Sequence, residues 1–103
     1  MSNYSVYVTP QAWKEIKQLP GTMRQRVKHA IDGFVSNPYP AKSKVLDVSE
    51  LPEFEGTLVR LRIERWRLVY MVSESEKTID VLAVRKRPPY DYQDLEELIE
   101  HVL

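Results

Sequence analysis

Arginines recur at alternate positions in two neighbouring apolar segments of this sequence. The segment TLVRLRI carries Arg60 and Arg62, and the segment RWRLVYMV, which begins at Arg65, also carries Arg67. Guanidinium groups stay charged at any physiological pH and match phosphate oxygens with a fixed fork of donors. The chemistry they predict is the binding of a phosphodiester, provided that a fold brings them to one surface.

Side chains alternate between the two faces of a strand, so alternation decides where these arginines point. Three strand-like runs, 57–63, 66–72 and 78–85, are joined by links short enough for hairpins, which predicts an antiparallel meander. In each run, the residues at alternate positions are apolar and are expected to face a core. The residues between them include the arginines and are expected on the opposite face. The second face carries Leu58 as well and is not expected to be core. Its basic members are Arg60, Arg62, Arg67, Arg85 and Arg87.

The segments before this meander predict a strand and a helix. Residues 4–8 alternate as a strand does, and the following Thr9-Pro10 supplies an N-cap and a first helical residue. A first helix is therefore expected over 10–19, up to the Pro-Gly break. Its inward positions are Trp13, Ile16 and either Ala12 or Leu19.

A second helix is predicted directly after that break. Thr22 and Gln25 have the spacing of a capping box, in which each side chain satisfies a backbone N–H of the first turn. Two helices joined by so short a break favour an antiparallel hairpin that covers one face of a sheet. The apolar stripe of the second helix is Met23, Val27, Ala30, Ile31 and Phe34.

The remaining segments complete the expected fold. Residues 39–56 show little periodicity and are predicted to form a surface loop with a short turn. Asp91 can cap a last helix whose apolar residues repeat with helical spacing. The sequence thus predicts a single α+β domain over residues 1–103, with an N-terminal strand and an antiparallel helical hairpin packed on an antiparallel sheet. The sheet contains a three-stranded C-terminal meander, and a C-terminal amphipathic helix follows it.

Composition narrows the classes of function. Of the 103 residues, 43% are hydrophobic and 29% are charged, as in an ordinary folded domain. The absence of cysteine excludes a disulfide framework, a thiolate metal site and a thiol nucleophile. No segment has the length and character of a signal peptide or a membrane span, so we expect a cytoplasmic protein without a membrane partner. No metal-ligand spacing occurs, and no cofactor is expected.

The net charge of zero hides an asymmetry along the chain. All 15 Lys and Arg lie at or before Arg87, whereas five of the 15 acidic residues lie in residues 91–103. Residues 1–90 therefore carry +5 and residues 91–103 carry −5. We hypothesise that the acidic segment covers the arginines in the free protein and that a partner displaces it.

A basic face of this kind favours RNA as its guest. Aromatic residues such as Tyr90 and Tyr92 can stack on single-stranded bases, and arginines can neutralise the charge that builds when a 2′-hydroxyl attacks the adjacent phosphorus. No general base is evident, because His29 and His101 lie on helices that should not reach this face. The alternative interpretation is structural: a single arginine on a strand is more often a solvated surface residue, and Trp66 more often fills a core.

The order of elements and four motifs resemble the RelE/ParE superfamily of toxins from type II toxin–antitoxin systems. The motifs are WKEIKQLP, RQRVKHAIDGFVSNPYP, LVRLRIERWRLVYMV and IDVLAVRKR, in this order over nearly the whole chain. The resemblance implies a RelE-like fold and a ribosome-dependent endoribonuclease that cuts mRNA on the ribosome without a metal. It also implies a cognate antitoxin that neutralises the toxin in a hetero-oligomer.

The resemblance assigns roles to individual residues. Arg67, in WRLVY, and Arg87, in RKR, match the family's arginines that hold the scissile phosphate and stabilise its transition state. A late tyrosine that stacks on the substrate base matches Tyr92 or Tyr90. The candidate catalytic residues are Arg67, Arg87, Arg60 and Tyr92, and the candidate substrate-binding residues are Arg62, Arg85, Lys86, Tyr90 and Lys44.

Two departures from the family leave alternatives open. Two lysines that precede the motif in the family are here Leu58 and Arg60. Arginine is a poor general base, so either Lys42, Lys44 or Lys86 substitutes for them or cleavage is slow or absent. Ribosome-directed members also tend to be strongly basic, unlike this chain. The runner-up function is therefore a ParE-like toxin that inhibits DNA gyrase without catalysis, and a third is an inactive relative that only binds a partner.

Overall fold

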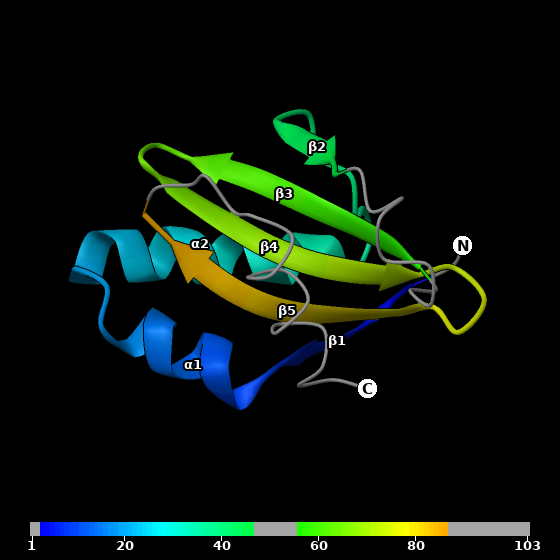
Figure 1. The fold of residues 1–103 in the computed structure, drawn as a ribbon, viewed down its shortest axis with the longest axis horizontal. Helices are drawn as coiled ribbons and strands as arrows, with labels where there is room; N and C mark the ends of the chain where they lie inside the picture. The colour runs from blue at the N-terminus through cyan, green and yellow to red at the C-terminus, as the bar shows by residue number, and fades with distance from the viewer. Residues whose placement is uncertain (1–2, 47–55, 87–103) are drawn as a thin grey trace.

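The computed structural model describes residues 3–46 and 56–86. Figure 1 shows a curved sheet with two helices on one side of it. The predicted C-terminal helix, Arg87, Tyr90 and Tyr92 lie outside the described residues. The elements are β1 (Ser5–Val8), α1 (Pro10–Lys17), α2 (Gly21–Phe34), β2 (Ser43–Val45), β3 (Thr57–Ile63), β4 (Trp66–Ser73) and β5 (Thr78–Arg85).

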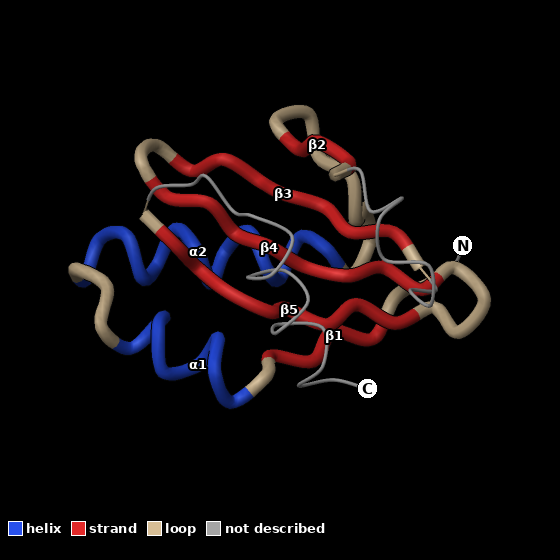
Figure 2. Tube along the Cα trace, in the orientation of Figure 1, coloured by secondary structure: helices blue, strands red, loops and turns tan. Residues whose placement is uncertain are grey.

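The sheet has five strands in the order β1-β5-β4-β3-β2. Strands β3, β4 and β5 form the predicted antiparallel meander, with bounds within one residue of those expected. The sheet is mixed rather than antiparallel as predicted, because β1 pairs with β5 in parallel. The loop predicted over 39–56 contains the edge strand β2, which pairs antiparallel with β3 (Figure 2). Three residues carry too little periodicity to reveal such a strand.

Helix α1 begins as predicted. The Thr9 hydroxyl accepts a hydrogen bond from the Ala12 N–H at 3.2 Å, and Pro10 is the first helical residue. The expectation that Trp13 points inward was wrong, because its side chain is 44% exposed. Ala12, Ile16 and the following Leu19 recur at steps of four and three residues, and Trp13 lies about a quarter turn away from this stripe.

Helix α2 carries the predicted apolar stripe but not the predicted capping box. It begins at Gly21, before Thr22, with Pro20 at the N-cap and no side-chain capping bond. The Pro20 carbonyl accepts the N–H of Arg24 at 2.8 Å. Neither helix in residues 3–46 is long and apolar enough to cross a membrane. Met23, Val27 and Phe34 are buried in the core, and Ala30 and Ile31 pack against it.

Both helices pack on the same face of the sheet, which we call the helix face. Tyr70 lies at its centre, fully buried, with its ring stacked on Phe34 at a centroid distance of 4.1 Å. Its hydroxyl donates a hydrogen bond to the Pro38 carbonyl at 2.5 Å. The strand residues of this core are Val59, Leu61, Ile63, Leu68, Tyr70, Val72, Ile79, Val81 and Val84.

Candidate functional site

Three arginines from three adjacent strands form a single cross-strand row. Arg62 of β3 lies opposite Arg67 of β4, and Arg67 lies opposite Arg85 of β5. Residues opposite each other on neighbouring strands project from the same face, with Cβ atoms about 5 Å apart. We call Arg62, Arg67 and Arg85 the arginine row.

The arginine row projects from the face opposite the helices, which we call the arginine face. Its next neighbours along the three strands, Leu61, Leu68 and Val84, belong to the core on the helix face. Because successive side chains alternate, the row must leave the sheet on the other side. One step further, Lys44 of β2 lies opposite Arg60 of β3 and joins the same face.

A β-bulge in β5 decides the direction of Arg85. Ile79 and Val81 point to the helices, so unbroken alternation would send Arg85 there too. The pairing of β4 with β5 shifts by one residue, which leaves Leu82 as an extra residue on β5. After the bulge Val84 points to the helices and Arg85 to the arginine face. Bulges commonly redirect side chains in this way.

The β3–β4 turn supplies a shared acceptor for two members of the row. The Glu64 carbonyl accepts hydrogen bonds from Arg62 Nε at 3.3 Å and from Arg67 Nη1 at 3.4 Å. Glu64 has φ of +56°, a left-handed conformation that a residue with a side chain adopts at a cost. The turn thus directs a backbone dipole toward the first two guanidiniums.

The third member of the row is held from helix α1. Glu15 Oε2 accepts a hydrogen bond from Arg85 Nε at 3.2 Å, and Glu15 Oε1 accepts the Val84 backbone N–H at 2.8 Å. The Gln11 side chain donates to Glu15 Oε2 at 3.0 Å. Sequence reasoning missed Glu15, because 70 residues separate it from Arg85 and only the fold brings the two together.

The row concentrates positive charge at one place. Like charges directly opposite each other on a sheet destabilise it, and arginine does not lose its proton to relieve the repulsion. A phosphate would offset this repulsion, and its oxygens suit a fork of N–H donors. Arg60 adds a buried Nε that has no hydrogen-bond partner within the described ranges. Chemically, this face can bind a phosphodiester and stabilise extra negative charge on it.

The apolar residues of the arginine face are buried, although this face was not expected to be core. Leu58 was expected on a face that is not core, yet it is completely buried. Met71 of β4 lies opposite Leu58 on the arginine face and is buried as well. The buried residues of β3, β4 and β5 outside the helix-side core are Leu58, Val69, Met71, Leu82 and Ala83.

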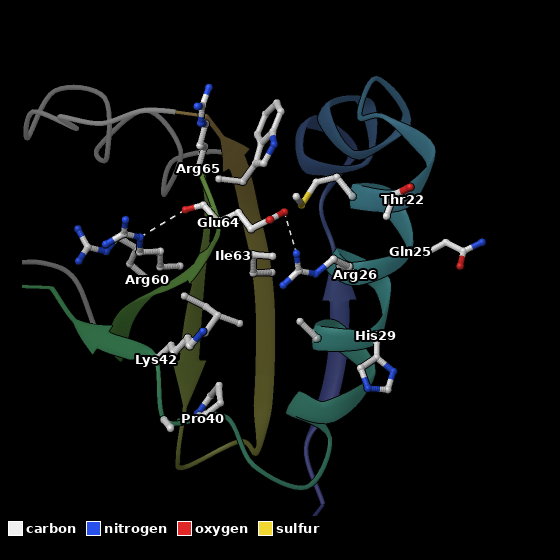
Figure 3. Close-up of a pocket in the computed structure, with 16 residues that line it drawn as sticks. Thr22, Gln25, Arg26, His29, Pro40, Lys42, Arg60, Ile63, Glu64 and Arg65 are labelled. Atoms are coloured by element: carbon white, nitrogen blue, oxygen red, sulfur yellow. Dashed lines mark hydrogen bonds and ion pairs between the residues drawn. The ribbon is translucent and has the colours of Figure 1, made fainter.

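A groove of about 1430 Å³ runs between α2 and the C-terminal end of β3 (Figure 3). Arg26 of α2 reaches across it to Glu64, with 2.7 Å between Nη1 and Oε2. His29 of α2 also lines the groove, but its ring points away from β3 (Figure 3). Trp66, expected to fill a core, is partly buried and packs against the core, and it also lines this groove. The basic residues that line it are Arg26, Lys42, Arg60, Arg62 and Arg65.

The structure therefore brings together part of the predicted site. Lys86 follows β5 and is exposed, and Lys42 lies in the groove rather than in a strand. In the described part of the chain, no three His, Cys, Asp or Glu side chains gather as metal ligands would. The roles of all these residues remain predictions. Arg60, Arg62, Arg67, Arg85 and Lys44 share the arginine face, whereas Arg87, Tyr90 and Tyr92 lie outside the described residues.

A family model described as ParE toxin of the type II toxin–antitoxin system parDE matches residues 6–88. The chain belongs to the RelE/ParE superfamily of type II toxin–antitoxin toxins. No functionally curated protein matches it.

Solved structures show the same fold. The archaeal RelE–RelB complex from Pyrococcus horikoshii is 23% identical, with a TM-score of 0.72 over 85% of this chain and 99% of that chain. The RelBE2 toxin–antitoxin complex from Mycobacterium tuberculosis is 25% identical, with a TM-score of 0.65 over 82% and 99%. A mutant of the E. coli toxin RelE in the free state is 22% identical, with a TM-score of 0.68 over 98% and 99%.

Proposed function

We propose that this toxin is an endoribonuclease that cuts mRNA on the ribosome and so inhibits translation in the cytoplasm. The observation that carries the proposal is the arginine row, in which three guanidiniums leave adjacent strands on one face. Such a row suits a phosphodiester, since each guanidinium can direct two parallel N–H donors at phosphate oxygens. Arg67, at its centre, is the residue we assign to the scissile phosphate.

The nucleophile of the proposed reaction is a hydroxyl group of the RNA itself. The 2′-oxygen loses its proton to a base and attacks the adjacent phosphorus, while the bond from phosphorus to the 5′-oxygen breaks. The departing 5′-oxygen takes up a proton from water, so that a 2′,3′-cyclic phosphate and a 5′-hydroxyl remain. Negative charge increases on the phosphate oxygens in the transition state, and pre-oriented arginines stabilise it without reorganisation. The arginine row and Arg60 form the proposed phosphate site, together with Arg87 and a stacking tyrosine, Tyr92 or Tyr90.

A base must take the proton of the 2′-hydroxyl. Lys44 is our candidate among Lys42, Lys44 and Lys86, because it lies opposite Arg60 on the arginine face, whereas Lys42 lines the groove. Lys86 stays a substrate-binding candidate at the end of β5. The ribosome itself is a second source of proton-transfer groups.

The proposed protein partner is a RelB-type antitoxin. RelE is in complex with RelB in the archaeal structure, and RelBE2 is a toxin–antitoxin complex. By analogy, we expect this chain to be neutralised in a toxin–antitoxin hetero-oligomer.

The second candidate is inhibition of DNA gyrase without catalysis. The family model that matches the chain is described as a ParE toxin, and leucine and arginine stand at the family's two lysine positions. In that case the arginine row would contact a protein or DNA and would not bind an RNA that the toxin cleaves.

Two reactions separate the candidates. Purified protein is added to translating ribosomes with a defined mRNA, and separately to a gyrase supercoiling reaction. We expect mRNA cleavage, read by primer extension, and expect Arg67→Ala to lower its rate by about a hundredfold or more. Lys28→Ala, an exposed charge on α2, is the matched control and should cleave as the wild type does. Loss of supercoiling with intact mRNA would establish the second candidate instead.

A further inference from the structure

The outer edge of β5 changes its partner halfway along the strand. Strand β1 pairs with Thr78–Val81, and the Thr9 N–H completes this edge by donating to the Val81 carbonyl. Beyond that point the N–H of Val84 meets the Glu15 carboxylate at 2.8 Å. After the bulge at Leu82, a side chain of α1 therefore replaces β1 as the hydrogen-bonding partner of the outer edge of β5.

Glu15 is itself firmly placed. The Thr9 cap fixes the first turn of α1, and Ala12 and Ile16 anchor the helix in the core with no exposed surface. Glu15 precedes Ile16, and its side chain is 19% exposed. A charge-assisted hydrogen bond in such a partly buried place is stronger than one on the surface.

We propose that Glu15 is a positioning residue for the arginine row. By binding the Val84 N–H and Arg85 Nε together, it holds the bulge in register and fixes the direction of the third guanidinium. It also places one negative charge at the end of a row of three positive charges, which offsets their mutual repulsion. The inference rests on the proposed function and deepens it, since the ligand of the row is a phosphodiester.

This role predicts an unusual pair of effects when the charge of Glu15 is removed. Glu15→Gln makes the face more cationic, so single-stranded RNA should bind more tightly and the salt slope of binding should steepen by up to about 0.7. Turnover should nevertheless fall, on the order of tenfold to a hundredfold in kcat, because a displaced guanidinium no longer meets the transition state. A residue that only supports the fold would lower binding and turnover together.

The experiment measures kcat and KM for ribosome-dependent cleavage, and RNA affinity against salt in the absence of ribosomes. The variants are Glu15→Gln, Arg85→Ala and the double variant, with Glu76→Gln in the β4–β5 turn as an exposed acidic control. If Glu15 acts through Arg85, the double variant should be no slower than Arg85→Ala alone. Multiplied losses in the double variant, or an unchanged kcat in Glu15→Gln, would overturn the proposal.

A second variant tests the positioning role with the positive charge of residue 85 retained. Arg85→Lys keeps the charge but lacks the Nε–H that Glu15 holds, so it should lose kcat as Glu15→Gln does; unaltered turnover argues against a positioning role. If the wild type cleaves no mRNA, the proposed function fails, and RNA binding alone tests the role of Glu15. The inference then requires that Glu15→Gln tighten RNA binding more in the wild-type background than in the Arg85→Ala background.

Discussion

The hydroxyl of Tyr70 is a single polar atom that helps to hold the core to the loop after α2. The residue is fully buried, and its hydroxyl donates to the Pro38 carbonyl at 2.5 Å. Tyr70→Phe keeps the stacking on Phe34 but leaves that carbonyl without its donor, so we expect unfolding free energy to fall by about 1–2 kcal/mol. Urea unfolding measures the loss. Tyr7→Phe, on a 56% exposed ring, is the control and should change nothing.

We expect Asp80 to make the free energy of unfolding depend on pH. Burial raises the pKa of Asp80 above its ordinary value. Because the folded state then holds the proton more firmly than the unfolded chain, Asp80 favours folding below its ordinary pKa, and this contribution is lost as pH rises through the folded pKa. We expect Asp80→Asn to raise the unfolding free energy at pH 7 and to have less effect at pH 3. Unfolding at both pH values tests this, with Asp32→Asn on α2 as the exposed control.

At the scale of single residues, the sequence predicted the arginines better than the groups that hold them. Alternation alone placed Arg60, Arg62 and Arg67 on one face, because strand parity is a local property. The acceptors lie elsewhere in the chain or in the backbone. Glu15 comes from the first helix, and the Glu64 carbonyl depends on a turn conformation that residue type alone does not specify.

The β3–β4 turn is the element on which two arginines depend. Its first residue, Glu64, has φ of +56°, where only glycine avoids a steric penalty of about 1 kcal/mol. Glu64→Gly and Glu64→Ala both lose the exposed ion pair with Arg26, and only glycine relieves the backbone. We therefore expect the glycine variant to be more stable than the alanine variant by about 1 kcal/mol in urea unfolding. Equal stability of the two variants would show that the turn carries no such strain.

The elements that the sequence could not predict are those that depend on pairing with a neighbouring strand. The meander was found to within one residue, because its strands are long and its links short. Strand β2 has three residues and exists only by pairing with β3. The bulge at Leu82 arises from the pairing of β4 with β5, and no residue type in the sequence predicts it. Arg85 nevertheless reaches the predicted face, because that prediction applied to the part of β5 after the bulge.

On the scale of the whole molecule, the two faces of the sheet are both partly apolar. The helices cover one face, yet apolar residues of the other are also buried, among them Leu58 and Val69 at 0% exposure. Residues 1–90 carry +5 and residues 91–103 carry −5. A cationic, partly apolar face and an acidic segment with apolar residues at helical spacing are complementary. This supports the hypothesis that residues 91–103 cover the arginine face in the free toxin.

Deleting residues 91–103 should then increase RNA binding by the free protein. The deletion raises the net charge from zero to +5, so we expect tighter binding of a single-stranded RNA and a salt slope steeper by about 0.7 for each additional phosphate contact. Fluorescence anisotropy of a labelled RNA at several salt concentrations measures both quantities.

A matched variant separates charge from physical cover. Replacing the five acidic residues of 91–103 with their amides gives the same net charge but keeps the apolar residues of the segment. If the segment acts only by its charge, the amide variant and the deletion should bind RNA equally. If it also occupies the arginine face, the deletion should bind more tightly, because RNA no longer competes with the apolar contacts. Affinity and salt slope that stay at wild-type values in both variants would leave the arginine face open in the free toxin, and the neutral net charge would then need another explanation.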